Sequence, residues 1–382
     1  MFETSFIEID SKKYRSNLRF LRHAFGTTSE LCLVIKGNAY GHGDKEIMNL
    51  GIEQGVTSFA VFSAEEALRL SDIRRHATRL AIMGDTDFAQ VAWAIENGIE
   101  FYVNNPETLK VAAIQSAKIN KKAKIHIEFE TGMNRLGFDR NEHDFLKQAL
   151  KASAGHFEVK GFCTHLAGAE SMANFPRIRS QISTFDDICD DYSNHGIAPE
   201  QRHAACSAAA IRFPETRYQM IRIGILQYGF WPSHETYIEH ITGTESRFDP
   251  LQRVITWKSR IMSTKNVHAG QYVGYGSSYL ANSDKKLAII PVGYSDGFAR
   301  SLSNKGRVLI KGQQAAVVGT VNMNALAVDV THISDAQIGD EVVLIGTQAE
   351  HTITVSSFSD FSEQLNYELL SRLPHKIPRS VI

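Results

Sequence analysis

The stretch Cys32-Leu-Val-Ile-Lys36-Gly-Asn-Ala-Tyr40-Gly-His-Gly43 joins an apolar, β-branched run to a lysine and a glycine-rich turn. The run 31–35 is typical of a strand that is buried on both faces of a sheet. Lys36 would then lie at the carboxyl end of that strand, where barrels and open α/β sheets keep their chemistry. A partly desolvated lysine there has a lowered pKa and can act as an amine nucleophile, for instance in a Schiff base. The alternative is a lysine that extends to water, and the stretch alone does not decide between them.

Short apolar runs alternate with segments of helical period from about residue 30 to residue 230. The candidate strands are 31–36, 58–62, 79–83, 100–103, 124–130, 159–165, 202–205 and 222–226. Helical segments lie between them, as at 64–70 and 178–192, and Ser63-Ala-Glu-Glu66 has the capping-box spacing of a helix start. Eight strands alternating with helices predict a (β/α)8 TIM-like barrel. A doubly wound sheet has the same periodicity and stays open as an alternative.

The pattern changes after about residue 236, where short strands are broken by Gly, Asn and Asp. The candidate strands are 254–261, 286–291, 307–310, 316–321, 326–330 and 341–345, and a helical pattern follows at 355–372. We therefore predict an α/β chain with a barrel at 11–236 and a mostly β C-terminal domain at 237–382. Residues 1–10 contain an alternating strand that could pair with the later β domain.

Composition excludes several classes of protein. Of 382 residues, 43% are hydrophobic and 22% are charged, which is ordinary for a globular protein. The net charge is −1 and no basic block occurs, so we expect no nucleic-acid partner. No stretch is long and apolar enough to span a bilayer, and the N-terminus carries no apolar signal core. The four cysteines are scattered without metal-ligand spacing, which predicts reduced thiols in a cytoplasmic protein without a bound metal.

Polar residues recur where the candidate barrel strands end. They are Glu128, Glu130, Arg135, His165, Ser207, Arg222 and Gly224. A TIM-like barrel places all strand carboxyl ends around one mouth. With Lys36, such a set could bind an anionic, carbonyl-bearing cofactor, and the Ser207 hydroxyl and the Gly224 amide suit a phosphate. Each residue alone also has a structural interpretation: an Arg135–Glu128 ion pair, a rim histidine or a tight turn.

The β domain adds two loops in which tyrosines are flanked by glycines. They are Tyr272-Val-Gly-Tyr275-Gly-Ser-Ser-Tyr279 and Pro291-Val-Gly-Tyr294-Ser-Asp-Gly297. Such loops are open to a ligand, but glycine–aromatic turns are also common in β domains. Composition alone favours the structural interpretation of both loops.

Taken in order, the motifs resemble one family. They are Ile35-Lys36-Gly-Asn-Ala-Tyr40-Gly-His-Gly, Glu130-Thr-Gly-Met-Asn-Arg135-Leu-Gly, Thr164-His165, Arg222-x-Gly224-x-x-x-Tyr228-Gly, Gly274-Tyr275-Gly and Gly293-Tyr294-x-Asp-Gly297. The chain resembles the bacterial alanine racemases, which are fold-type III enzymes that use pyridoxal 5′-phosphate. The resemblance extends through Asn366-Tyr367-Glu and Ile377-Pro-Arg379, and so covers essentially the whole chain.

The resemblance implies a two-base racemisation of L- and D-alanine that supplies D-alanine for peptidoglycan. Lys36 would bind the cofactor through a Schiff base and serve as one acid/base group. Tyr275, from the partner subunit of a homodimer, would serve as the other on the opposite face of the cofactor-bound substrate. A phenol with a pKa near ~10 is a weak base at neutral pH, so cationic or hydrogen-bonding neighbours must lower that pKa. The family places the histidine that matches His165 and an arginine nearby.

The remaining site residues follow from the same resemblance. Arg222 would face the pyridine nitrogen and oppose its protonation. Arg135 would bind the cofactor's phenolic oxygen and the substrate carboxylate. The phosphate-binding positions match Tyr40, Ser207, Gly224, Ile225 and Tyr367. Met323 and Tyr294 match substrate-pocket positions that the other subunit supplies.

The sequence departs from the family pattern at several positions beside this site. Glu128 stands where many members carry a carbamylated lysine, and the following family Asp is Glu130. Cys206 replaces an Asn before Ser207, and Asn324 replaces an Asp after Met323. These changes keep a second interpretation open, a racemase of another or broader set of amino acids such as serine. A fold-type III decarboxylase and a non-enzymatic pyridoxal-phosphate carrier rank lower, because neither needs the Gly-Tyr-Gly tyrosine.

Overall fold

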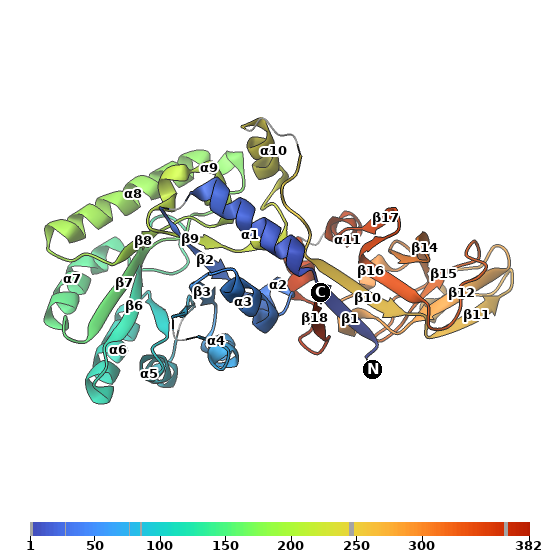
Figure 1. Cartoon of the computed structure of the whole chain (residues 1–382), viewed down its shortest axis with the longest axis horizontal. Helices are drawn as coiled ribbons and strands as arrows, with labels where there is room; N and C mark the ends of the chain where they lie inside the picture. Colours follow the sequence, from blue (N-terminus) through green and yellow to red (C-terminus); the bar gives the residue numbers. More distant parts are fainter. Residues whose placement is uncertain (1–2, 27, 76, 85, 244–247, 363–365) are drawn as a thin grey trace. The chain divides into compact units, whose positions relative to one another are not determined.

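The computed structural model describes residues 3–382 except 27, 76, 85, 244–247 and 363–365. The chain divides into two compact units, coloured along the sequence in Figure 1. The barrel unit comprises residues 12–37 and 47–253. The β unit comprises residues 1–11, 38–46 and 254–382, so the segment that follows Lys36 clusters with the C-terminal strands.

The barrel unit is built on eight parallel strands whose order in the sheet is β8-β7-β6-β5-β4-β3-β2-β9. They are β2 (Glu30–Val34), β3 (Ser58–Val61), β4 (Arg79–Ile82), β5 (Glu100–Val103), β6 (Ala123–Glu128), β7 (Phe157–Cys163), β8 (Gln201–His203) and β9 (Met220–Ile223). The two end strands approach each other, because Gln219 N donates to Arg202 O (3.3 Å) and Arg222 N to Ala205 O (3.0 Å). The eight strands predicted from the sequence are confirmed, and the nearly closed ring decides for the barrel over a doubly wound sheet.

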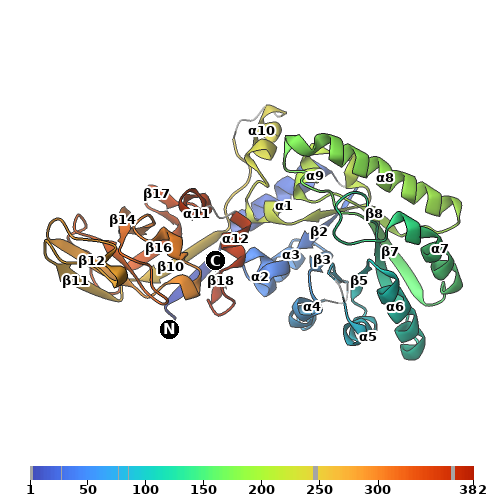
Figure 2. The same cartoon turned by 180° about the vertical axis from the view of Figure 1, so that it is seen from behind.

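Helices connect the strands, and Figures 1 and 2 show α4 to α8 on the outer face of the strand ring. The helices of this part of the chain are α1 (Ser11–Phe25), α3 (Asp44–Glu53), α4 (Ala64–Ser71), α5 (Phe88–Glu96), α6 (Pro106–Ile119), α7 (His143–Ala152), α8 (Phe175–Asn194), α9 (Ser207–Arg212) and α10 (His234–Thr242). The predicted capping box is present, since the Ser63 side chain accepts from Glu66 N and the Glu66 carboxylate accepts from Ser63 N. These bonds satisfy amides that a helix start leaves without partners.

The β unit contains a ten-stranded, largely antiparallel sheet. Its strands are β1 (Ser5–Ile9), β10 (Ile255–Arg260), β11 (Ser263–Val267), β12 (Lys285–Ile290), β13 (Arg307–Ile310), β14 (Gln313–Val318), β15 (Leu326–Asp329), β16 (Glu341–Gln348), β17 (His351–Ile353) and β18 (Arg379–Val381). The N-terminal strand β1 pairs antiparallel with β10 and parallel with β18. Trp257, Phe298 and Leu344 are fully buried in its core.

Three strands of the β unit, β11, β17 and β18, were not predicted from the sequence. β11 is Ser-Thr-Lys-Asn-Val and only its last residue is buried, so it lacks the apolar alternation that marks a strand. The helical pattern predicted over 355–372 forms two helices, α11 (Val355–Ser362) and α12 (Asn366–Ser371), and residues 363–365 lie outside the described part. No helix among the described residues has the length and apolarity needed to cross a membrane.

Candidate active site

Lys36 follows β2 after one residue, Ile35, and lies beyond the carboxyl end of that strand. Its side chain is half-buried, and its Nζ lies 5.9 Å from the centroid of the Phe62 ring. Burial and the charges of Arg135 and Arg222 lower the pKa of Lys36, although Glu66 opposes them. A larger fraction of this amine is therefore neutral near pH 7 than for an exposed lysine, and a neutral amine can act as a nucleophile.

The backbone after Lys36 winds in the left-handed sense. Residues 37–41 have φ angles of 62°, 54°, 51°, 52° and 80°, so Asn38, Ala39 and Tyr40 all adopt a conformation that favours glycine. This segment is labelled α2 (Lys36–Tyr40) in Figure 1. Left-handed helical backbone costs roughly 1–2 kcal/mol per L-residue, and such strain concentrates at functional sites. The glycine-rich sequence signalled a turn here, but it did not reveal the left-handed winding.

Hydrogen bonds within the β unit hold this strained segment. Gly43 N donates to Asn38 O and Asp44 N to Asn38 Oδ1, both at 3.0 Å. The Arg379 guanidinium donates to Gly41 O at 3.0 Å. A Cβ on Gly41 would lie 2.0 Å from Leu370 O, so only glycine allows this close approach to α12. The segment is therefore fixed by residues near the end of the chain.

Two predicted phosphate-binding residues meet in the same unit. The rings of Tyr40 and Tyr367 lie 5.9 Å apart between centroids. Tyr40 is the last residue of α2 and Tyr367 lies in α12. The close approach of Gly41 to this helix explains how two residues more than 300 positions apart come together.

Arg222 lies buried on β9. Its guanidinium donates to Thr164 O (2.8 Å), His203 O (2.9 Å) and Ala204 O (3.1 Å), and also to His203 Nδ1. These bonds fix both terminal nitrogens of the side chain. A permanently charged group is thereby held in a single orientation within the barrel.

His165 follows Thr164 near the end of β7. Burial and the charges of Arg222, Arg135 and Lys36 lower the pKa of His165 to about 3, so the imidazole is neutral at physiological pH. Gln181 on α8 donates from its Nε2 to His165 O at 3.0 Å and to Thr131 Oγ1 at 3.2 Å. This buried glutamine was not singled out in the sequence. A lone polar residue on a helix gives no signal beyond its place in the helical pattern.

The loop that carries Arg135 is organised by Glu130. Its carboxylate accepts from the backbone amides of Gly132, Asn134 (2.7 Å) and Arg135 (3.3 Å). Burial raises the pKa of Glu128, and the charges of Arg222 and Arg135 partly offset this effect. Among the ion pairs of the described residues there is none between Arg135 and Glu128. The carboxylate support of this loop comes from Glu130 through the backbone.

Ser207, Gly224 and Ile225 come together at the ends of β8 and β9. Gly224 N donates to Ser207 Oγ at 3.0 Å. Ser207 begins α9, and Ile225 begins the 3₁₀ turn η4 (Ile225–Tyr228). The first turn of a helix presents backbone N–H groups that lack intrahelical partners. The donor set therefore suits the oxygens of a phosphate group.

Tyr275, Tyr294 and Met323 lie on exposed loops of the β unit. Their exposed fractions are 77%, 43% and 55%. Thr320 Oγ1 donates to Tyr275 O at 3.2 Å, and Tyr294 N donates to Asn322 O at 3.0 Å. Residues 320–323 thus tie the two tyrosine loops into one surface. An exposed aromatic surface of this kind is typical of a ligand or protein contact.

Two glycines set the course of the Tyr275 loop. Gly274 and Gly276 have φ angles of 70° and 74°, which places Tyr275 at the tip of a tight bend. Nearby, Asn324 Nδ2 donates to Ser295 Oγ at 2.8 Å, so the amide that replaces the family carboxylate bonds to its own unit. The sequence motif left this loop between a ligand contact and a structural turn, and the structure shows the Tyr275 side chain exposed.

Three cations, Lys36, Arg135 and Arg222, are close enough in the barrel unit to act on one another or on His165. With the Ser207 hydroxyl, which accepts from Gly224 N and keeps its own proton to donate, this charge suits an anionic compound that carries an aldehyde and a phosphate, as pyridoxal phosphate does. No cluster of His, Cys, Asp or Glu within the described residues could hold a metal ion. The fit to a pyridoxal-phosphate ligand rests on this donor set.

Comparison with known proteins matches both units to one family. The alanine racemase N-terminal domain model matches residues 9–232, and the C-terminal domain model matches residues 254–381. The alanine racemase of Leptospira interrogans is 33% identical over 99% of this chain and 96% of that protein. The crystal structure of alanine racemase from Streptomyces lavendulae has a TM-score of 0.89 at 29% identity, covering 99% of this chain and 97% of that chain. The alanine racemase of Bartonella henselae, solved with covalently bound pyridoxal phosphate, has a TM-score of 0.84 at 26% identity over the whole of both chains.

Proposed function

This chain belongs to the alanine racemase family, and we propose that it interconverts L- and D-alanine with pyridoxal 5′-phosphate as its cofactor. The observation that carries the proposal is the state of Lys36. Its amine lies at a barrel strand end, and burial and two guanidinium groups lower its pKa. A lysine in that environment can condense with an aldehyde.

The chain offers a group for each part of the cofactor. Lys36 would hold its aldehyde carbon, Arg222 would face its ring nitrogen, and Arg135 would face its phenolic oxygen. His165 would lie among the cofactor-binding residues. The phosphate would be bound by Tyr40, Ser207, Gly224, Ile225 and Tyr367. When bound, pyridoxal phosphate supplies an electron sink that makes the α-proton of an amino acid acidic.

Two groups of the protein would move the α-proton. The Lys36 Nζ would take or return a proton on one face of the substrate, and the Tyr275 Oη would do so on the opposite face. Racemisation needs both faces, because a single base returns the proton to the side from which it came. Arg222, which keeps its charge, would oppose protonation of the ring nitrogen and so limit electron withdrawal. Arg135 would orient the substrate carboxylate as well as the cofactor.

We also propose that the tyrosine comes from a second copy of the chain. Tyr275 is 77% exposed, and the neighbouring Met323 and Tyr294 are exposed on the same tied loops. These three residues would complete the substrate pocket of a homodimer, with Tyr294 and Met323 contacting the substrate. A phenol that stays in water is a poor base at neutral pH, because the reference pKa of tyrosine is near ~10.

Two wider roles go with this activity. D-alanine formed by the enzyme would supply peptidoglycan synthesis. The protein would act in the cytoplasm, and its four cysteines agree with a reducing compartment, since all are free and three are buried.

The test combines a substrate panel with a spectrum. We expect faster racemisation of alanine than of serine or larger amino acids, and a visible absorbance band from cofactor bound to Lys36. Lys36→Ala should lose the band and lower turnover by at least ~10³-fold. Lys45→Ala, at an exposed lysine on α3, serves as the control and should change neither. A preference for serine would support the broader racemase interpretation and contradict ours.

A further inference from the structure

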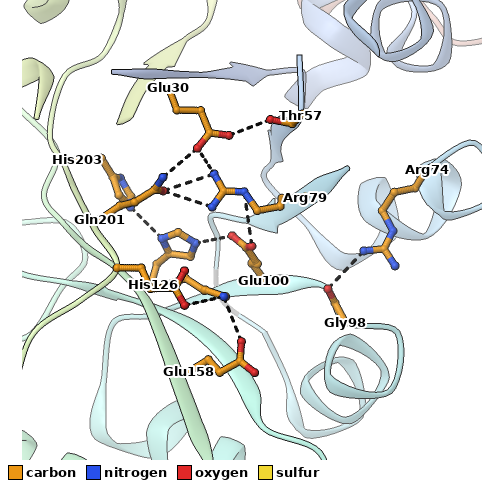
Figure 3. A network of polar contacts seen from close by, with 12 residues as sticks. Glu30, Thr57, Arg74, Arg79, Gly98, Glu100, His126, Glu158, Gln201 and His203 are labelled. Carbon is orange, nitrogen blue, oxygen red and sulfur yellow. Dashed lines mark hydrogen bonds and ion pairs between the residues drawn. The ribbon is translucent and has the colours of Figure 1, made fainter. Parts of the chain in front are cut away.

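A line of buried polar side chains crosses the interior of the barrel from Arg222 to β5. Arg222 Nη1 donates to His203 Nδ1, and the His203 Nε2 lies 2.8 Å from His126 Nδ1. The His126 Nε2 lies 2.8 Å from Glu100 Oε2. Figure 3 shows the two imidazole rings and the Glu100 carboxylate pointing toward one another. None of these three residues was singled out in the sequence.

The two ends of this line fix every proton along it. An arginine can only donate, so His203 Nδ1 must accept and its proton must lie on Nε2. His126 Nδ1 then accepts that proton's hydrogen bond, which leaves the proton of His126 on its Nε2. This proton is donated to Glu100 Oε2, which accepts it. Each histidine is neutral and has one tautomer.

Burial makes this arrangement strict. Glu100, His126 and His203 are 2%, 1% and 0% exposed, so water cannot replace a lost partner. A Cβ on Gly161 would lie 2.3 Å from His126 Nδ1 and 2.5 Å from His203 Nε2. A glycine in β7 is therefore required at the point where the two rings meet. The missing side chain at Gly161 provides the space for this contact.

At the Glu100 end of the line, Arg79 favours the ionised carboxylate. Arg79 Nε lies 4.0 Å from Glu100 Oε1, and Arg79 is held in turn by Glu30 and Gln201 (Figure 3). Burial alone would raise the pKa of Glu100, but the hydrogen bond from His126 and the charge of Arg79 lower it overall. The carboxylate is thus ionised at neutral pH, which agrees with its role as the acceptor for His126.

The line leaves one donor of Arg222 for another partner. Four of its five N–H groups are used by Thr164 O, His203 O, Ala204 O and His203 Nδ1. The Nε–H is the one to which the hydrogen bonds of the described residues assign no acceptor. In the proposed function, this donor would face the ring nitrogen of the cofactor.

We propose that Glu100, His126 and His203 are positioning residues for Arg222, which orient its guanidinium and place one fixed negative charge behind it. The inference rests on the proposed function for its catalytic meaning. The carboxylate makes each imidazole a better acceptor, since charge-assisted hydrogen bonds are stronger and neighbouring bonds polarise one another. A strong acceptor at Nη1 stops the guanidinium from rotating and moderates the charge that it presents at Nε.

The first readout is the tautomer of the two histidines, measured by ¹⁵N NMR of the protein without cofactor. Difference spectra with His126→Asn and His203→Asn assign their signals among the 15 histidines. We expect both rings to be neutral and protonated on Nε2. A proton on His203 Nδ1, or a doubly protonated His126, would overturn the proposal whatever reaction the protein catalyses.

The second readout is kinetic and uses Glu100→Gln, which keeps an acceptor of the same shape and removes the charge. We expect kcat for alanine to fall roughly tenfold or more with KM within about twofold, while both Nε2 protons remain and the ¹⁵N signals of His203 shift. Glu158→Gln is the matched control, since Glu158 is a strand carboxylate that pairs with Lys160 outside the line. This control should change neither kcat nor the His203 signals.

Glu100→Leu removes the acceptor as well as the charge. It should leave the His126 Nε2 proton without an acceptor, shift the ¹⁵N signals of both rings, and lower kcat further than Glu100→Gln. If the expected tautomers are seen but Glu100→Gln leaves kcat at the wild-type value, the line is only structural and the proposal fails. If wild-type protein does not racemise alanine, the proposed function fails, but the tautomers can still be measured.

Discussion

The strand-end residues of the barrel and the tyrosine loops of the β unit are held in different ways. Arg222 is buried and bonded to three backbone carbonyls, and Lys36 is half-buried between charged neighbours. Tyr275 and Tyr294 lie exposed on loops whose backbones bond to residues 320 and 322. One chain can preorganise the first set alone, whereas the second set needs another surface to leave water. This difference is the structural basis for proposing a dimer.

Substituting the exposed Tyr275 should give the largest effect on activity with the smallest effect on stability. Tyr275→Phe should lower kcat by roughly 10²–10⁴-fold, because it removes one of two acid/base groups. The free energy of unfolding should change by less than about 0.5 kcal/mol, since the side chain is exposed. Racemisation rates and urea unfolding test both statements. Tyr272→Phe, on the same loop and also exposed, is the control. Full activity of Tyr275→Phe would remove the tyrosine from the mechanism.

A substitution in the loop that follows Lys36 should instead lower mainly the stability of the fold. Gly41→Ala places a Cβ 2.0 Å from Leu370 O at a φ of 80°. We expect a loss of about 3 kcal/mol in the free energy of unfolding, from strain and overpacking together. Gly55→Ala has a similar φ of 74° with nothing within 4 Å and should lose only about 1 kcal/mol. Equal losses from the two variants would show that the contact with α12 is unimportant.

A smaller effect is expected in the pH dependence of stability, which should differ between buried and exposed histidines. Burial lowers the pKa of His42 from 6.5 to about 4, against two hydrogen bonds from its ring to backbone carbonyls. The folded chain therefore binds fewer protons than the unfolded chain between these values. Stability from this group is complete above about pH 6.5 and is lost as the pH falls toward 4.

Unfolding by urea over this pH range measures the contribution. Wild type should lose about 1.4 kcal/mol more per pH unit than His42→Gln. His23→Gln, at an exposed histidine of α1, is the control and should keep the wild-type slope. If His42→Gln also keeps that slope, the buried imidazole does not titrate as described.

Much of the fold could be predicted from the sequence, because apolar runs and capping signals are local. All eight barrel strands and the helix start at Ser63 were found in this way. The strand β11 was missed because its exposed residues carry no alternation, and the left-handed segment because nothing in Asn38-Ala39-Tyr40 requires it. That segment is stabilised by Arg379 and α12, which lie far along the chain.

The candidate site could likewise be predicted only in part. Lys36 and Arg222 could be picked out from their places at strand ends, and their roles were taken from a family resemblance. Those roles stay predictions. His126, His203 and Glu100 gave no local signal, because each looks like an ordinary strand residue until the barrel brings them together. Only the three-dimensional structure shows that Arg222 lies at one end of this hydrogen-bonded line and the Glu100 carboxylate at the other.

The central claim is that Lys36 of one copy acts with Tyr275 of another. Lys36→Ala and Tyr275→Phe proteins should each be nearly inactive alone. When they are unfolded together and refolded as a mixture, about half of the dimers should combine one copy of each, and each such dimer has one intact site of two. The account predicts recovery of up to roughly a quarter of wild-type kcat per chain. A mixture that forms mixed dimers but stays inactive would contradict it.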